Sequence, residues 1–136
     1  MTEQRTPRIL IIAGSDSGGG AGVQADIKTV TMLGGHAMTA ITAVTAQNGL
    51  GVDAVHPVPA EIVLAQIESV ISDFGVDAIK IGMIGSAFTA RMVAERLETL
   101  EPRVPLVFDP VMVATTGAAL ADDATIDAFG RLMDLA

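Results

Sequence analysis

The sequence predicts an α/β fold with a mainly parallel sheet that is covered by helices on both faces. Two observations lead to this prediction. Short apolar runs, which are typical of buried strands, alternate along the chain with segments whose apolar residues recur at helical spacing. Helices between strands are typical of right-handed βαβ crossovers, which join parallel strands. The chain has 136 residues, of which 50% are hydrophobic, so it has the length of one domain and can bury a sizeable core.

The first strand and the first helix are expected within residues 8–33. Residues 8–13, RILIIA, predict a fully buried strand, because Arg8 is followed by an uninterrupted apolar run. A helix is expected next, because four apolar residues recur at helical spacing: Val23, Ile27, Val30 and Leu33. Gly34 and Gly35 are expected to end that helix.

The middle of the chain predicts a second strand, a short edge strand and a second helix. Residues 36–46, HAMTAITAVTA, are β-branched and apolar, which favours a buried strand, and residues 52–58 could add a short edge piece. Pro59 is favourable in the first turn of a helix over about residues 60–73. Five apolar residues mark one face of that helix: Val63, Ile67, Val70, Ile71 and Phe74.

The remaining elements repeat the same alternation. Strands are expected over residues 77–82 and 105–109. The helix between them is expected to bury a stripe of four residues: Phe88, Met92, Val93 and Leu97. A last helix should begin at Asp122 and Asp123, because aspartate is favoured at helix starts. Its inner face is expected to carry three apolar residues: Ile126, Phe129 and Met133.

The composition excludes several classes of function. A net charge of −8 argues against a nucleic-acid partner, which needs a basic surface. Cysteine is absent, which excludes disulfides, a thiolate nucleophile and Cys-ligated zinc. The start MTEQRTPR lacks the apolar core of a secretory signal, and no apolar run approaches the roughly 20 residues that span a bilayer. We therefore expect a cytoplasmic protein without a membrane partner.

Four loops are expected to meet in space, since ligands of such sheets gather beyond the carboxyl ends of the strands. Each loop follows a predicted strand: residues 14–22, 47–49, 82–85 and 109–111. The first, GSDSGGGAG, lacks the Lys and Ser or Thr of a Walker phosphate loop, and it has Val23 where the dinucleotide fingerprint GxGxxG needs glycine. This glycine loop is therefore either a ligand-binding loop of another kind or a tight turn.

Side chains in and near these loops indicate a binding site, although each has a structural alternative. Asp26 either faces the cleft or complements the positive start of its helix. The amide of Gln47 presents a donor beside an acceptor, which fits an aminopyrimidine edge, or it caps loop backbone groups. Met83 and Val111 either form apolar walls for a ring or belong to the core. Asp109 either faces a metal-bound nucleotide or binds neighbouring loop amides.

The basic and imidazole side chains are not expected to contribute to a site. Lys80 lies inside a predicted strand and should reach solvent at the margin of the sheet. No Lys or Arg is therefore expected near a strand end, where it could clamp a phosphate. His36 and His56 lack a spaced His or carboxylate partner, so neither is expected to hold a metal.

Four segments, in this order and at this spacing, closely resemble the hydroxymethylpyrimidine/phosphomethylpyrimidine kinases of thiamine biosynthesis, which belong to the ribokinase-like superfamily. The segments are AGSDSGGGAGVQADIKT, TAVTAQNG, IKIGMIGS and FDPVMVATTG, and the resemblance runs from about Arg8 to the last residue. It implies an α/β/α three-layer sandwich. It also implies ATP-dependent phosphorylation of 4-amino-5-hydroxymethyl-2-methylpyrimidine and then of its monophosphate, with ATP and Mg²⁺ as cofactors and a homodimer at full length.

The resemblance also implies roles for individual residues. It implies that five of them line the pyrimidine pocket: Gly14, Asp26, Gln47, Met83 and Val111. Gln47 would hydrogen-bond the aminopyrimidine, and Met83 and Val111 would lie against its ring. Asp109 would lie towards the ATP phosphates.

Members of this family are roughly twice as long as the chain, and their second half holds most of the ATP site, an anion hole and the catalytic base. The resemblance therefore implies that residues 1–136 are the N-terminal half of a single, truncated ribokinase-like kinase domain, with no catalytic residue and no activity alone. Two alternatives are a pyridoxal kinase-like enzyme and a non-catalytic pyrimidine-binding module that ends at Ala136. The AQN segment and the SDSGGGAG loop favour the pyrimidine over pyridoxal.

Overall fold

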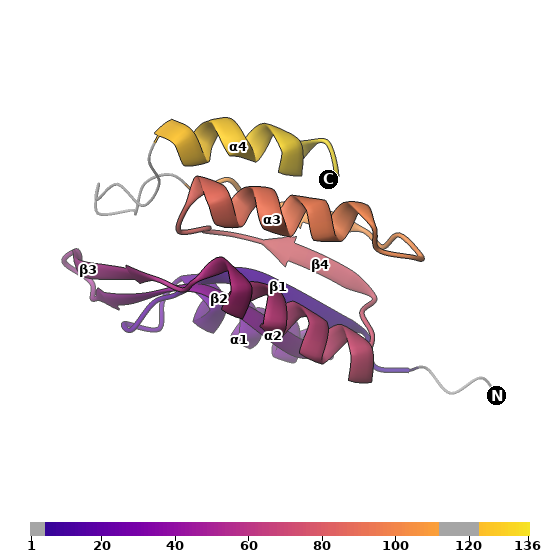
Figure 1. Cartoon of the computed structure of the whole chain (residues 1–136). Coiled ribbons are helices and arrows are strands. Elements are labelled where there is room, and N and C mark those ends of the chain that lie inside the picture. The colour runs from indigo at the N-terminus through magenta and orange to yellow at the C-terminus, as the bar shows by residue number, and fades with distance from the viewer. Residues whose placement is uncertain (1–4, 112–122) are drawn as a thin grey trace.

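The computed structural model describes residues 5–111 and 123–136 (Figure 1). In the described residues five strands form one sheet with the order β3-β2-β1-β4-β5. Their bounds are Arg8–Ser15 (β1), His36–Gln47 (β2), Val52–Pro57 (β3), Ala78–Ile81 (β4) and Leu106–Phe108 (β5). β1, β2, β4 and β5 run parallel, whereas β3 pairs antiparallel with β2. The mainly parallel sheet predicted from the sequence is therefore confirmed.

Helices cover both faces of the sheet. Their bounds are Gly22–Met32 (α1), Ala60–Asp73 (α2), Ala87–Glu98 (α3) and Asp123–Met133 (α4). α1 packs against β1 and β2, while α2 packs against β2 and α3, and α4 packs against α3 (Figure 1). The three layers are thus α1, the sheet, and the group formed by α2, α3 and α4.

β1 shows why two helical layers are needed. Alternate side chains of a strand point to opposite faces of its sheet. Leu10 and Ile12 pack into the cluster of buried side chains that includes α2, α3 and α4, whereas Ile11 and Ala13 pack with Val23 of α1. All four β1 residues are buried, so the run ILIIA is apolar throughout because both of its faces are covered.

The predicted inner faces of the helices are partly wrong. Five residues expected to point inward are exposed: Ile27, Leu33, Phe74, Phe88 and Met133. Phe88 is 57% exposed because the buried stripe of α3 runs instead through Ala90, Val93, Ala94 and Leu97, whose two alanines allow close approach to the neighbouring elements. In α4, Leu132 is buried in place of Met133. Asp122 lies outside the described residues, as do the side chains of Asp123 and Ile126.

The strand boundaries bear on the position of the site. β1 continues two residues beyond its predicted end, to Ser15, and its pairing with β2 shifts register between Ala13 and Ser15. β4 and β5 are shorter than predicted, so the residues after Ile81 and Phe108 leave the sheet early. In the part of the chain that the structure describes, no helix has the length and apolar character to cross a membrane.

Candidate functional site

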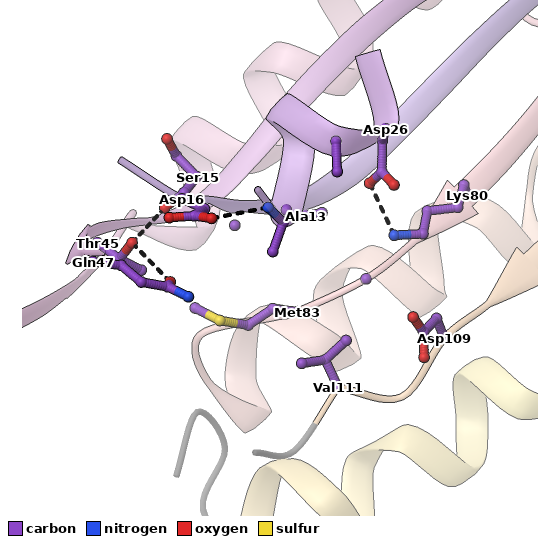
Figure 2. A pocket seen from close by; sticks show the side chains of 15 residues that line it. Ala13, Ser15, Asp16, Asp26, Thr45, Gln47, Lys80, Met83, Asp109 and Val111 are labelled. Atoms are coloured by element: carbon purple, nitrogen blue, oxygen red, sulfur yellow. Dashed lines mark hydrogen bonds and ion pairs between the residues drawn. The ribbon is translucent and has the colours of Figure 1, made fainter. Parts of the chain in front are cut away.

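A cavity of about 370 Å³ lies at the carboxyl ends of β1, β2 and β4 (Figure 2). This edge is where parallel α/β sheets bind ligands. Residues from all four loops that were expected to converge line the cavity, together with residues of α1 and Lys80 of β4. All six residues singled out in the sequence are among them: Gly14, Asp26, Gln47, Met83, Asp109 and Val111.

The glycine loop is held in shape by its own aspartate. The carboxylate of Asp16 accepts three backbone N–H groups, from Gly18 at 2.8 Å, Gly20 at 3.0 Å and Ala21 at 2.9 Å. The backbone N–H of Gly19 also bonds to the carbonyl of Asp16 at 3.0 Å. Asp16 is only 7% exposed, so its charge is compensated largely by these dipoles. These four N–H groups are therefore already used within the loop.

Two glycines shape the place where the loop meets the rest of the pocket. Gly22, the first residue of α1, has φ +59°, and a Cβ there would lie 2.3 Å from the carbonyl oxygen of Gly14. A Cβ on Gly14 would in turn lie 3.1 Å from Cε of Met83. Gly22 thus allows the chain to return close to β1, and Gly14 leaves room for the Met83 side chain at the pocket wall.

Gln47 directs its side-chain amide into the pocket, towards Met83 (Figure 2). Its backbone is fixed by Ser17, whose Oγ accepts the N–H of Gln47 at 2.7 Å and donates to the carbonyl of Gln47 at 2.6 Å. Thr45 Oγ1 lies 3.3 Å from Gln47 Oε1, but the single hydroxyl proton has a better acceptor in the carbonyl of Ser15 at 2.7 Å. Within the described residues, Nε2 of Gln47 has no hydrogen-bond partner.

The alternative role for Gln47, capping loop backbone groups, belongs to its neighbour Asn48. Oδ1 of Asn48 accepts the N–H groups of Leu50 at 2.8 Å and Gly51 at 3.2 Å. Asn48 therefore closes the turn between β2 and β3. The amide of Gln47 is left available to a ligand.

Lys80 lies in the pocket, and the expectation that it reaches solvent at the margin of the sheet is wrong. β4 lies between β1 and β5, so it is an inner strand, and its Lys80 side chain extends to the α1 side. Nζ of Lys80 lies 2.8 Å from Oδ2 of Asp26, and the two side chains are 27% and 21% exposed. A Cβ on Gly82 would lie 3.0 Å from this Nζ, so glycine leaves space for the ammonium group. A cation does therefore lie close to a strand end.

Asp26 does not complement the positive start of its helix, which was the alternative role considered for it. It is the fifth residue of α1, and no acidic residue lies in the first turn of that helix. The carboxylate of Asp26 pairs with Lys80 across the pocket rather than with the helix start. The pair links α1 to β4.

The pocket has two chemically different ends. We call the region around Gln47 the amide end and the region around Asp26, Lys80 and Asp109 the charged end. Figure 2 shows Met83 and Val111 between these two ends. Met83 is buried and Val111 is half-buried, so both offer apolar surface to the cavity. This arrangement fits a small ring with a polar edge at the amide end and a reacting group at the charged end.

The family model described as phosphomethylpyrimidine kinase matches residues 16–136. The chain belongs to the phosphomethylpyrimidine kinase family. The resemblance seen in the four sequence segments is thereby confirmed, and the fold agrees with it. The match includes the glycine loop from Asp16 onward and all of the pocket residues except those at the end of β1.

Two curated relatives of the chain are named hydroxymethylpyrimidine/phosphomethylpyrimidine kinase. A hydroxymethylpyrimidine/phosphomethylpyrimidine kinase of Mycobacterium bovis is 50% identical over 131 residues, which are 96% of this chain and 48% of that protein. The protein of that name from Haemophilus influenzae is 49% identical over 130 residues, covering 95% of this chain and 48% of its own length. The chain spans about half the length of these relatives.

Solved structures give the same family and a related one. A phosphomethylpyrimidine kinase from Clostridium difficile superposes with a TM-score of 0.86 at 41% identity, covering 97% of this chain and 57% of that one. A pyridoxal kinase from Staphylococcus aureus in complex with pyridoxal gives a TM-score of 0.79 at 34% identity, covering 93% and 46%. The ribokinase-like α/β/α sandwich is therefore shown, and the likeness to pyridoxal kinase is the weaker of the two.

Two residues of the site were missed from the sequence. Asp16 carries a local signal, because a carboxylate followed by glycines at the second and fourth positions is typical of an Asx turn that bonds its own loop. Lys80 carries no such signal, since only the sheet order shows that its strand is an inner one.

Proposed function

We propose that the chain forms the pyrimidine-binding half of a hydroxymethylpyrimidine/phosphomethylpyrimidine kinase. The full-length enzyme would use ATP to phosphorylate 4-amino-5-hydroxymethyl-2-methylpyrimidine and then its monophosphate. Family membership and the names of relatives that are about 50% identical support this proposal. The structural observation that carries it is the Gln47 amide, which faces the pocket with Nε2 unpartnered among the described residues.

The amide end would recognise the polar edge of the pyrimidine. Gln47 Oε1 would accept a hydrogen bond from the exocyclic amine, and Nε2 would donate one to the adjacent ring nitrogen. Met83 and Val111 would contact the faces of the ring, and Gly14 would keep the wall beside Met83 open. In this orientation the hydroxymethyl group would extend towards the charged end.

ATP and Mg²⁺ are the proposed cofactors. Mg²⁺ is commonly held by one or two carboxylates together with substrate phosphates, so it needs little protein ligation. The carboxylate of Asp109 is exposed at the pocket rim and offers the oxygen ligand that this ion prefers. Among the described residues no group of three or more His, Cys, Asp or Glu side chains could form a cage of protein ligands alone. When bound, the ion would neutralise charge on the transferring phosphoryl group.

The catalytic base and the anion hole are not assigned to this chain. We propose that residues 1–136 are the N-terminal half of a single kinase domain and that the remainder of the full-length enzyme supplies both features. Phosphoryl transfer requires stabilisation of charge on the transferred group as well as substrate binding. The 136 residues expressed alone should therefore show no kinase activity above background. A cytoplasmic homodimer without nucleic-acid or membrane partners is proposed for the full-length enzyme.

A pyridoxal kinase activity is the second candidate, because the structure resembles that of the Staphylococcus aureus enzyme at 34% identity. The test is ATP-dependent phosphorylation by the purified full-length protein, with the pyrimidine alcohol, its monophosphate and pyridoxal as substrates. We expect a higher kcat/KM for the pyrimidine alcohol than for pyridoxal. Phosphorylation of pyridoxal without phosphorylation of the alcohol would overturn the proposed function.

A further inference from the structure

Lys80 is the one cationic side chain that lines the pocket in the described part of the chain. Its ammonium group has three N–H donors, and one of them bonds to Oδ2 of Asp26 at 2.8 Å. The Lys80 side chain is 27% exposed, and Figure 2 shows its Nζ directed into the space between α1 and β4. The group can therefore bind Asp26 and still donate to a ligand in the cavity.

The other charges around the cavity are negative. Asp16, Asp26 and Asp109 also line it. The N–H groups of Gly18, Gly20 and Ala21 do not offset a bound anion, because they already bond to Asp16. Without Lys80, an anionic ligand at the charged end would meet two carboxylates and no cation among the described residues.

The two substrates of the proposed function differ most at this point. The pyrimidine alcohol is neutral, whereas a phosphate monoester carries about −1.5 to −2 charges at neutral pH. We propose that Lys80 is a specificity-determining residue, which binds the phosphate of the monophosphate substrate by donating to it in addition to, or in place of, Asp26. This inference rests on the proposed function and deepens it.

The two phosphoryl transfers also place different demands on the site. In the first, the alcohol oxygen bonds to the γ-phosphorus of ATP, the bond to the ADP oxygen breaks, and the hydroxyl proton must pass to a base. In the second, a phosphate oxygen that is already ionised forms the new bond, ADP leaves with the electron pair, and no proton need be removed. The second transfer instead requires compensation of the substrate's own charge. Lys80 can compensate the charge of the monophosphate, whereas the neutral pyrimidine alcohol needs no such compensation.

The test compares the two transfers in the full-length enzyme. Lys80→Met should lower kcat/KM for the monophosphate by about 10- to 100-fold relative to its effect on the alcohol, which is the range for a lost charge-assisted hydrogen bond. Taking the ratio of kcat/KM for the monophosphate to kcat/KM for the alcohol cancels any effect of the substitution on ATP that both reactions share. Lys80→Arg keeps the charge and should retain most of the ratio. Arg91→Met, which removes a positive charge from the exposed side of α3, should leave the ratio unchanged.

Binding without nucleotide provides a second readout. Calorimetry should show that Lys80→Met weakens binding of the monophosphate and leaves binding of the alcohol nearly unchanged. If Lys80→Met does not fold because Asp26 loses its partner, the variant Lys80→Met/Asp26→Asn is compared with Asp26→Asn alone, and the same selective loss is expected.

Two results would overturn the inference in different ways. Equal losses for both substrates, in rate and in binding, would show that Lys80 does not discriminate between them, while the proposed function would stand. A wild-type enzyme that phosphorylates neither pyrimidine would overturn both the proposed function and the role of Lys80.

Discussion

Replacing Asp16 should destabilise the protein through its glycine loop. Asp16→Ala removes one acceptor group from three backbone N–H donors, at 2.8–3.0 Å. A hydrogen bond to a charged group contributes about 1.5–3 kcal/mol, so three of them set an upper limit of roughly 4.5–9 kcal/mol. The loop residues Gly18, Gly20 and Ala21 are exposed, so water can replace part of the loss. We therefore expect the free energy of unfolding to fall by about 2–4 kcal/mol.

Asp16→Asn is a sharper variant because the structure separates the two carboxylate oxygens. Oδ2 accepts from Gly20 and Ala21, while Oδ1 accepts from Gly18. The amide oxygen can replace Oδ2, but its NH₂ group would then face the N–H of Gly18. The expected loss is about 1–2 kcal/mol, which lies between wild type and Asp16→Ala.

Urea unfolding of the full-length protein, monitored by circular dichroism, measures both losses. Asn48→Ala is a matched control, because the Asn48 side chain accepts hydrogen bonds from two backbone N–H groups in an exposed turn and does not line the pocket. It should cost less than Asp16→Ala. If the free energy of unfolding of Asp16→Ala equalled that of the wild type, the assignment of Asp16 as the residue that holds the loop would be refuted.

Two further predictions concern backbone conformation and pH. Gly22→Ala should lower the free energy of unfolding by more than about 2 kcal/mol, because φ of Gly22 is +59° and a Cβ there would lie 2.3 Å from the carbonyl oxygen of Gly14. Gly49→Ala is the control: no atom beyond its chain neighbours lies within 4 Å of a Cβ at Gly49, so this variant should be nearly neutral in the same denaturation assay. The hydrogen bond from the Arg8 guanidinium holds the pKa of Asp77 well below its usual range, with further contributions from the Arg8 backbone N–H and from Arg5. A depressed folded-state pKa stabilises the protein fully above the unfolded value of about 4, and this stabilisation is lost progressively as the pH falls from that value through the lower folded-state pKa. Wild type should therefore lose more stability than Asp77→Asn between pH 5 and pH 2, as measured by thermal unfolding. An equal dependence of stability on pH in the two proteins would contradict this account.

The sheet was predictable because its strands depend on local patterns. ILIIA, residues 9–13, is apolar at every position, and β1 is indeed buried on both faces. The faces of the helices were less predictable, because a helix such as α3 buries the residues that allow the closest packing. Ala90 and Ala94 are buried there and Phe88 is exposed, a choice that hydrophobicity alone would reverse.

The pocket was predictable to the extent that strand ends converge. Gln47, Met83 and Asp109 come from separate segments, and the parallel topology alone brings such loops to one edge. Lys80 was placed wrongly because the sequence does not reveal the order of strands in the sheet. The structure places β4 beside β1, which packs against α1. Lys80 of β4 therefore lies on the side of the sheet that faces α1, where it pairs with Asp26.

The central claim is that the Gln47 amide recognises the aminopyrimidine edge, and calorimetry on the full-length enzyme tests it most directly. The measurement compares wild type and Gln47→Ala, each with the pyrimidine alcohol and with an analogue that lacks the exocyclic amine. We predict that Gln47→Ala weakens binding of the amino compound by about 1–3 kcal/mol, because its polar edge is left unpaired in a half-buried pocket, and weakens binding of the analogue by less. Unchanged affinity for the amino compound in a folded Gln47→Ala protein would contradict the account.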